Sequence, residues 1–433
     1  MSKKKSTPVE MQIVNPHAAG IDIGSKEHYV AVAPYLCKEA VRSFGCFTED
    51  LHAIAKWLKE CKVTSVAMES TGVYWIPLFL LLEEHGFEVF LVNAQHVKNV
   101  SGRKTDESDC QWIQKLHSFG LLTASYQPDL HTRALRSYVR HRKNLIQSSQ
   151  VHLLRMQKAL EQMNIKVQHV IADITGKTGT AIIDAILAGE RDATVLSNLI
   201  DVRIRATKEE VKKSLEANWQ EVHLFELKQS RELWDFYRQK IADCTKEIET
   251  VISDVKSQQP LDGDKPPISQ PKDYLNFIYG VDVTAIWGIK ENTAIELLAE
   301  IGPDMSKWKT EKHFSSWLGI SPNNKISGGK IISSKTQKKQ NKAGQLFKMI
   351  AYAIQRSDHW LAVFYRRIRA KGGPKKAIVA TAHKLAIIFY KMVKTKQAFN
   401  PIKKEDYENL FKQQKIKQLE KQAFKLGLVL APC

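Results

Sequence analysis

Between residues 18 and 126, short apolar runs typical of strands alternate with segments that have the spacing of helices. AAGIDIGS, HYVAVAPY and VRSFGCF predict three strands, close enough together to form a meander. EDLHAIAKWLKEC then predicts a helix, with apolar residues three and four positions apart from Leu51 to Leu58. VTSVAME, WIPLFLLLEEHG and FEVFLVN predict a strand, a helix ended by Gly86 and another strand, joined by crossovers. This part of the chain is therefore restricted to a mixed α/β domain.

From residue 127 to 258 the pattern becomes almost entirely helical. One segment has apolar positions from Leu153 to Met163. A second alternates steps of three and four residues from Trp234 to Val255, which is a coiled-coil seam of about three heptads. The seam suits a long helical hairpin, a pairing between subunits or the core of an intramolecular bundle, and the pattern leaves these alternatives open.

A proline- and glycine-rich break, QQPLDGDKPPISQP, marks the clearest domain boundary. After it, GIKENTAIELLAEIG predicts a glycine turn and a helix, and from residue 339 onward the chain is helical and strongly basic. The expected domains are a basic tail at 1–17, an α/β domain at 18–126, a helical or coiled-coil domain at 127–258, a linker at 259–273 and a mostly helical domain at 274–433.

The charge balance favours a polyanionic partner. Lysine and arginine number 65 against 46 acidic residues, which gives a formal net charge of +19 and a pI near 9.5. Nucleic acid is the commonest partner of such a chain. A membrane surface is the alternative, but the sequence has neither a long apolar run nor a basic amphipathic terminal anchor.

The start of the chain and its cysteines indicate the compartment. MSKKKSTPVEMQ is basic but lacks the apolar core of a secretory signal, so we expect a mobile tail that touches phosphates. The absence of a close CxxC pair argues against a zinc knuckle, and the scattered cysteines argue against a disulfide framework. We therefore expect a protein of the reducing cytoplasm. The six cysteines are Cys37, Cys46, Cys61, Cys110, Cys244 and Cys433.

Four carboxylates of the first domain stand where α/β proteins build sites. Asp22 lies inside an apolar strand, where a charge is costly unless it is paired or binds a metal. Glu69 ends a strand and precedes a polar turn. Asp106 and Asp109 share one face of a helix predicted from Asp106 to Phe119 and stopped by Gly120. Convergent carboxylates repel one another unless cations lie between them, and Mg²⁺ accepts such oxygen ligands and bridges to phosphate.

Each acid also has an ordinary structural explanation. Asp106 could cap its helix, Glu69 could pair with a lysine, and Asp22 could accept hydrogen bonds from turn amides. The explanation for Asp22 is the weakest of the three, because the flanking residues are so apolar.

The motifs GIDIGSKEHYVAV, AMESTGVYW and GRKTDESDCQWIQKLHSFGLL, in this order and spacing, resemble the amino-terminal domain of DEDD-type insertion-sequence transposases. The family is the insertion-sequence one-ten family, and HAAGIDIGS with DCQWIQKLHSFGLL is most similar to its eleven-eleven branch. The resemblance implies a RuvC-like fold of RNase H type. It also implies that Asp22, Glu69, Asp106 and Asp109 hold Mg²⁺, which Mn²⁺ can replace.

The carboxy-terminal part resembles the second transposase domain of this family, through WGIKENTAIELLAEIG and SWLGISP. The resemblance implies a catalytic serine at Ser327, in the basic loop NNKISGGKIISS. Gly328 and Gly329 would let the backbone approach a phosphate closely. A lone serine needs activation, which metal held by the four acids could supply if the two domains meet. The alternatives are that Ser327 is only a turn residue, or that nearby Ser333 or Ser334 acts instead. Extra residues in YGVDVTAIWGIKENT depart from the family pattern.

The resemblance implies a DNA transposase or recombinase that works through a serine–phosphodiester intermediate. It also implies an element-encoded noncoding guide RNA, assembly as dimers and tetramers, and a prokaryotic, nucleoid-associated protein in the cytoplasm. The absence of a GxxxxGK[ST] loop agrees with chemistry that needs no ATP. The basic residues expected to contact nucleic acid are Arg103, Lys104, Lys325, Lys330, Arg366, Arg367, Arg369, Lys371, Lys375 and Lys376.

Two other function classes are kept as alternatives. One is a RuvC-like nuclease or junction resolvase in which the acids activate water and Ser327 is structural, without a guide RNA. The other is a nucleic-acid-binding protein that has lost catalysis. A protein–DNA adduct that survives detergent separates the first alternative from the transposase, because attack by water leaves none.

Overall fold

The computed structural model describes residues 12–93, 106–257, 271–337 and 341–429. It divides into two compact units, Met1–Gln127 and Pro128–Cys433, and each is described by itself. Among the helices in these described ranges, none is long and apolar enough to cross a membrane.

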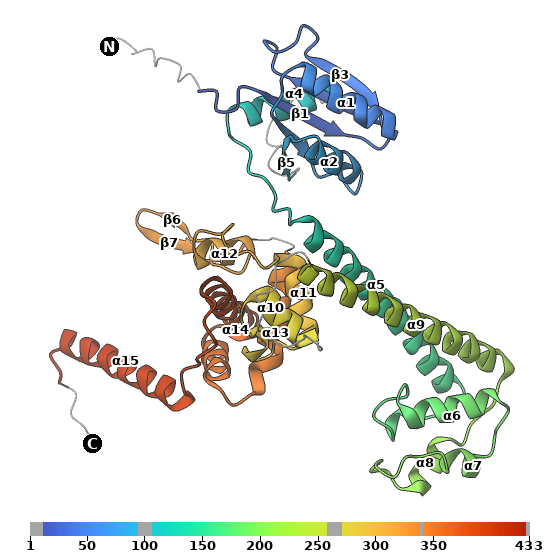
Figure 1. Ribbon diagram of the computed structural model, residues 1–433. Coiled ribbons are helices and arrows are strands. Elements are labelled where there is room, and N and C mark those ends of the chain that lie inside the picture. Colours follow the sequence, from blue (N-terminus) through green and yellow to red (C-terminus); the bar gives the residue numbers. More distant parts are fainter. Residues whose placement is uncertain (1–11, 94–105, 258–270, 338–340, 430–433) are drawn as a thin grey trace, which may run out of the picture. The chain divides into compact units, whose positions relative to one another are not determined.

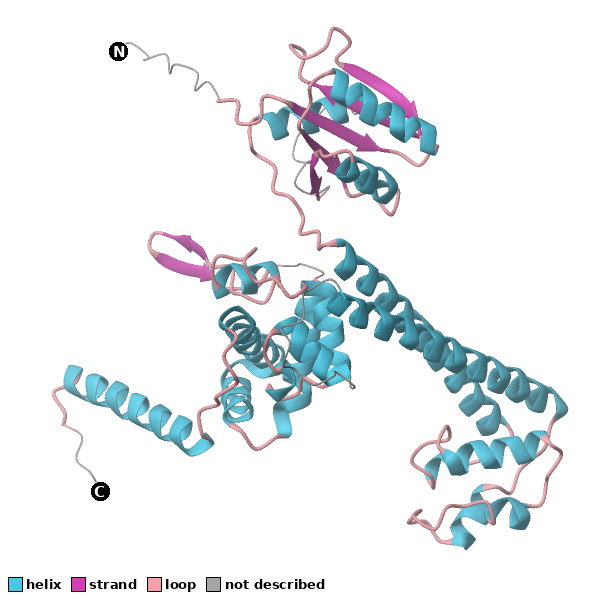
Figure 2. Cartoon of the chain, viewed as in Figure 1, coloured by secondary structure: helices cyan, strands magenta, loops and turns pink. Residues whose placement is uncertain are grey.

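The first unit is built on a five-stranded sheet with helices on both faces (Figures 1 and 2). Its strand order is β3-β2-β1-β4-β5. The first three strands form an antiparallel meander, while β4 and β5 run parallel to β1. The elements are β1 (Ala18–Ile23), β2 (Glu27–Val32), β3 (Val41–Gly45), α1 (Thr48–Glu60), β4 (Ser65–Glu69), α2 (Trp75–Glu84), β5 (Glu88–Val92) and α4 (Asp106–Ser118).

These elements confirm the predicted meander, the crossovers and the mixed α/β class. One face of the sheet packs Ile21, Val66 and Met68 against apolar residues of α1 and α2. The opposite face packs Ala67 and Val92 against Ile113 of α4. Successive strand residues point to opposite faces, so this division fixes which side each remaining strand residue occupies.

The second unit begins with two long helices, α5 (Leu130–Gln162) and α9 (Glu221–Ser257), which lie side by side (Figure 1). The rings of His152 and Tyr237 stack at 5.4 Å, and the Cys244 thiol donates to the Tyr138 carbonyl at 3.4 Å. Because 138 lies opposite 244 and 152 opposite 237, the helices are antiparallel. Between them the chain forms η1 (Val167–His169), α6 (Lys177–Leu187), α7 (Ala193–Ser197) and α8 (Lys208–Ser214).

The predicted seam on α9 is therefore used within the chain. Trp234, Cys244 and Ile248 are buried, and the core around Trp234 includes Met156 and Leu160 of α5. Of the three alternatives, the intramolecular helical hairpin accounts for this burial.

The remaining helices form the carboxy-terminal part of the second unit, which also carries a small β-hairpin (Figure 2). Gly288 has φ +84°, confirming the predicted glycine turn before α11. The extra residues before it form a defined turn, in which Asp282 accepts a hydrogen bond from the Thr284 backbone at 2.9 Å. The elements are α10 (Pro271–Tyr279), η2 (Val283–Ala285), α11 (Glu291–Ile301), α12 (Glu311–Trp317), β6 (Lys325–Ser327), β7 (Lys330–Ser333), α13 (Lys342–Ala353), η3 (Ile354–Arg356), α14 (Trp360–Thr395) and α15 (Lys404–Lys425).

Candidate functional site

Asp22 and Glu69 stand at the same edge of the sheet. Ile21 of β1 pairs with Met68 of the parallel strand β4, and the two acids are the next residues of their strands. Their neighbours Ile21 and Met68 belong to the core under α1 and α2. Alternation therefore directs both carboxylates to the opposite face, the one that α4 covers.

Helix α4 lies directly against β1 on this face. A Cβ atom at Gly20 would overlap the backbone nitrogen of Gln114 and would also meet the carbonyl oxygen of Cys110. Only a residue without a side chain allows this approach. The close contact brings the first turns of α4 next to the strand that carries Asp22.

Of the two predicted acids on α4, the structure describes the side chain of Asp109 but not that of Asp106. Asp109 is half-buried and precedes Cys110, which is fully buried. Burial, together with the smaller effect of the negative charge of Asp22, raises the pKa of the Cys110 thiol to about 12. This places the Asp22 carboxylate within electrostatic reach of α4. Asp106 is the first residue of α4, and its side chain lies outside the described residues, as do Arg103 and Lys104.

The donor chemistry of these positions suits a hard divalent cation, since the half-buried residues Asp22, Glu69 and Asp109 carry carboxylate oxygens, the donors that such cations accept. Within the described ranges, no three histidine, cysteine, aspartate or glutamate side chains are close enough together to hold a metal. Asp22 has interactions with other groups. The structure therefore brings the acids Asp22 and Glu69 to one edge and α4 to the same face, and the side chains that it describes there do not by themselves complete a set of metal ligands.

Ser327 lies at the end of β6, beside the turn of the β6–β7 hairpin. Ser327 pairs with Lys330 across Gly328 and Gly329, whose φ values are +55° and +76°. Positive φ at both central residues is the requirement of a two-residue type I′ turn, and glycine meets it without strain. The sequence predicted a loop here, and the structure has a hairpin. Ser327, Lys325 and Lys330 are all exposed.

The basic residues predicted on α14 divide into two groups. Arg369, Lys371, Lys375 and Lys376 are exposed, around a kink at Gly373 that precedes Pro374. By contrast, the Arg367 guanidinium lies 4.0 Å from the ring centroid of Phe411 and 5.5 Å from that of Tyr407, both on α15. Arg366 donates to the Gln355 and Ser357 carbonyls at 3.3 Å. Arg367 is thus half-buried against α15, whereas Arg366 is exposed and uses its guanidinium for hydrogen bonds within its own chain.

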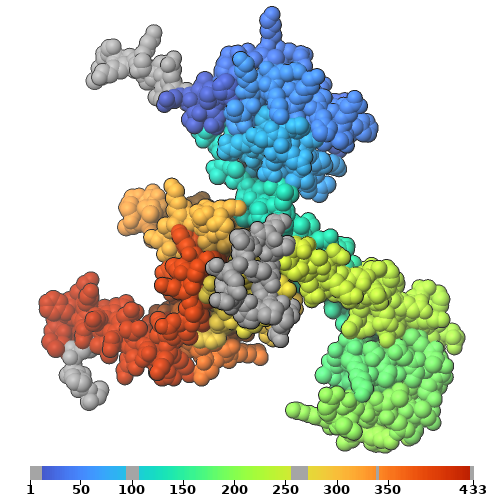
Figure 3. Space-filling model, viewed as in Figure 1, coloured from blue at the N-terminus to red at the C-terminus, as the bar shows by residue number. Residues whose placement is uncertain are grey.

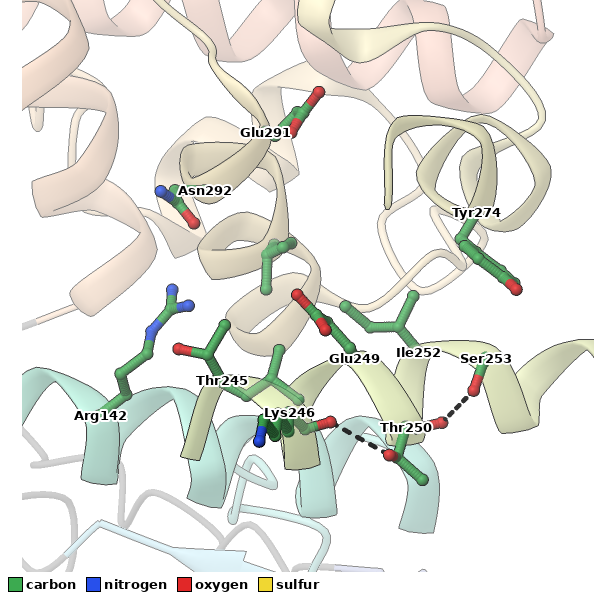
Figure 4. A pocket seen from close by; sticks show the side chains of 12 residues that line it. Arg142, Thr245, Lys246, Glu249, Thr250, Ile252, Ser253, Tyr274, Glu291 and Asn292 are labelled. Atoms are coloured by element: carbon green, nitrogen blue, oxygen red, sulfur yellow. Dashed lines mark hydrogen bonds between the residues drawn. The ribbon is translucent and has the colours of Figure 1, made fainter. Parts of the chain in front are cut away.

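Two features escaped the sequence analysis. The role of Gly20 could have been suspected, because it is a glycine flanked on both sides by apolar residues of the predicted first strand. The second is a cavity of about 460 Å³ between α5, α9, α10 and α11, into which Arg142 extends toward Asn292 (Figure 4). Glu249 and Glu291 also line it, so its charge is mixed. Arg142 can be recognised in the sequence as a cation within a predicted helix, but the sequence does not show that it is buried.

Comparison with known protein families gives two matches. A model described as a transposase, of the DEDD type named for IS110, matches residues 19–165. A second, described as the transposase IS116/IS110/IS902 family, matches residues 282–366. Together they span more than half of the 433 residues. No curated protein matches the chain. The first match covers all four acids, and the second covers the β6–β7 hairpin and the turn before α11.

Proposed function

The chain belongs to the IS110-type transposases, and on this premise we propose that it cuts and rejoins DNA through a covalent bond to Ser327. In this proposal Asp22, Glu69, Asp106 and Asp109 hold Mg²⁺, and an element-encoded noncoding RNA selects the DNA. The observation that carries the proposal is the common position of Asp22 and Glu69 at adjacent parallel strand ends, on the face covered by α4.

The acids are proposed to form an anion-rich edge that only a cation can neutralise. A bound Mg²⁺ would offset the carboxylate charges and those of a phosphodiester. The contribution of the chain is position: β1 and β4 fix two carboxylates, and the contact at Gly20 fixes the helix that carries the other two. Residues 94–105, which include Arg103 and Lys104, precede this helix and lie outside the described residues.

Ser327 is proposed as the nucleophile. Its Oγ would attack the phosphorus, form a serine–phosphate ester and displace the 3′ oxygen, which leaves as a hydroxyl with the proton lost by the serine. The same 3′ hydroxyl, presented on the exchanged strand, reverses the attack and frees the serine. The phosphate ester conserves the bond energy, so no nucleotide hydrolysis is needed. Lys325 and Lys330, exposed on either side, supply positive charge for the phosphate.

The test of this chemistry is a search for a protein–DNA adduct that survives detergent, using purified protein, Mg²⁺ and DNA that carries the native flanks of the element. We expect the wild type to form the adduct and Ser327→Ala to lose it while still binding DNA. Ser333→Ala is the matched control, on the opposite strand of the same hairpin, and should retain the adduct. DNA cleavage by the wild type without any adduct would show that water is the nucleophile and would support the nuclease alternative.

The metal site is tested separately. Asp22→Asn and Asp109→Asn should abolish adduct formation and leave the thermal melting temperature within a few degrees of wild type. Normal recombination by these variants in excess Mg²⁺ would show that the acids do not form the site.

The guide RNA is tested by expressing the gene with its native flanking DNA and sequencing the RNA that stays bound through a high-salt wash. One discrete species that maps to the noncoding end of the element supports the guided mechanism, in which base pairing selects the sequence. Heterogeneous cellular RNA, or none, would favour a DNA enzyme without a guide.

A further inference from the structure

The two faces of the β6–β7 hairpin differ in chemistry. Ile326 pairs with Ile331, and the next pair is Ser327 with Lys330. Side chains of paired residues point to the same side, and successive pairs alternate, so the isoleucines occupy the face opposite Ser327. Lys325, two residues before Ser327, shares the polar face. One side of the ribbon is thus apolar, and the other carries the candidate nucleophile with two lysines.

The apolar face is open in this chain. Ile326 is 63% exposed and Ile331 is 61% exposed, and Ile332, the extra residue where the pairing register shifts, is 70% exposed. The hairpin projects from the helices of its own unit in both the ribbon and the space-filling views (Figures 1 and 3). Three adjacent exposed isoleucines on a two-stranded ribbon leave apolar surface in water, which indicates a binding partner.

The charge of the sequence that flanks the hairpin indicates the kind of partner. Residues 312–357 contain nine lysines or arginines and no aspartate or glutamate. A protein partner would bury these cations only with matching acids, whereas nucleic acid offers phosphates next to flat apolar bases. Two-stranded ribbons bind DNA in either groove, and isoleucine is among the residues that minor-groove proteins insert between base steps. Cations around an apolar ribbon therefore favour nucleic acid.

We propose that Ile326 and Ile331 pack against the bases beside the phosphodiester that Ser327 attacks, and that they unstack the base step there. This inference rests on the proposed role of Ser327. The two faces then act together: the polar face holds the phosphate between Lys325 and Lys330, and the apolar face separates the bases. The local distortion fixes the register of the backbone relative to the serine hydroxyl.

The test measures unstacked bases directly, before any strand is cut. Ser327→Ala, in the full chain with the RNA it retains, is bound to DNA carrying the native flanks of the element. Permanganate then marks unstacked thymines, and diethyl pyrocarbonate marks unstacked purines. The comparison protein carries Ile326→Ser and Ile331→Ser in the same Ser327→Ala background. A third protein, with leucine at both isoleucine positions, is the conservative control.

We expect reactive bases beside the phosphate at which the wild type forms its adduct. The variant with Ile326→Ser and Ile331→Ser should lose this reactivity. Its affinity for DNA should fall by no more than about threefold, because phosphate contacts dominate affinity. The leucine pair should retain the base reactivity. When Ser327 is restored, the variant with Ile326→Ser and Ile331→Ser should form the adduct at least about tenfold more slowly than the wild type.

Two results would overturn the inference. Base reactivity that does not depend on Ile326 and Ile331 would show that they do not touch the bases. A smaller mass of the serine variant in sedimentation without DNA would show that the isoleucines form a contact between protein chains. Neither result depends on serine chemistry, because the footprints use Ser327→Ala. Failure of the proposed function would appear separately, as an adduct that persists without Ser327.

Discussion

At position 20 the chain requires a residue without a side chain, and the requirement comes from a helix far along the sequence. A methyl group at Gly20 would overlap the backbone of α4 at Gln114. We predict that Gly20→Ala destabilises the protein by about 1–3 kcal/mol, the usual cost of overpacking. It should also abolish adduct formation, because the displaced α4 carries Asp106 and Asp109. Urea unfolding and the adduct assay measure the two effects.

Gly86→Ala is the matched control for this substitution. Gly86 follows α2 with φ +85° and has no atom within 4 Å of a Cβ built on it. Alanine there costs about 1–2 kcal/mol through its backbone conformation alone. A similar loss of stability with adduct formation intact is expected. Equal loss of activity in both variants would mean that Gly20 matters only for folding.

His117 predicts acid sensitivity of the same packing. Its Nε2 lies 3.0 Å from the Ser65 hydroxyl oxygen, its ring is 4.6 Å from that of Phe90, and burial lowers its pKa to about 4. Between pH 6.5 and 4 the unfolded state binds more protons at this residue, so its contribution to stability is present above pH 6.5 and is lost as the pH falls.

We expect the free energy of unfolding to lose up to about 3 kcal/mol from His117 across this interval. His117→Gln keeps a hydrogen-bonding side chain but cannot titrate. The difference between wild type and His117→Gln should therefore shrink with falling pH. An equal difference in the free energy of unfolding between the two proteins at pH 7 and at pH 5 would show that His117 does not cause the acid sensitivity.

At the scale of elements, a partly buried charge cluster joins α5 to α11. The Arg140 guanidinium donates to both Glu300 carboxylate oxygens, at 2.9 and 2.8 Å, and Arg136 donates to the Ala299 and Glu300 carbonyls. The Glu300 side chain is only 11% exposed. Glu300→Gln would leave two arginines without their counter-charge.

We predict that Glu300→Gln destabilises the second unit by about 2–3 kcal/mol, because breaking a buried pair leaves an uncompensated charge. Arg203→Gln is the control, since the Arg203 side chain is 82% exposed in its pair with Asp201. The free energy of unfolding of this control variant should not differ measurably from that of the wild type. Comparable losses in both variants would mean that the Glu300 cluster behaves as a surface pair.

Elements with local signals were predictable from sequence. Glycine tolerates positive φ, so Gly86 and Gly120 predicted the ends of helices and Gly288 predicted a turn. In the structure all three residues have positive φ. The short apolar runs predicted the strands of the sheet. The contact between Gly20 and Gln114 could not be predicted, because it joins residues 94 positions apart. Likewise, Arg367 and Arg369 look alike in sequence. Only the packing of α15 against α14 separates them.

The hairpin at Ser327 shows the same limit. Its two glycines predicted a close approach of backbone to phosphate, but glycines suit an open loop as well as a type I′ turn. The pairing of Ile326 with Ile331 decides in favour of the hairpin. The four acids could be singled out from their positions at strand ends and on a helix face, whereas Ser327 came from the family resemblance, and the roles of all five stay predictions.

At the scale of the whole molecule, the net charge of +19 predicts binding to nucleic acid that weakens with salt. The exposed cations around the kink of α14 should account for much of it. Each phosphate contact contributes about 0.9 to the slope of log affinity against log salt concentration on duplex DNA. Replacing the four by glutamine should lower the slope by about 3–4. The four residues are Arg369, Lys371, Lys375 and Lys376.

A control with equal loss of charge removes four exposed cations of α9. That helix interleaves acids with its cations, so its field is largely balanced, and we expect a slope change below about one. Fluorescence anisotropy with a random duplex between 50 and 300 mM salt, on the order of physiological values, measures both slopes. If the α9 variant lost as much slope as the α14 variant, binding would follow total charge and not the basic surface of α14. The control residues are Lys228, Arg238, Lys240 and Lys246.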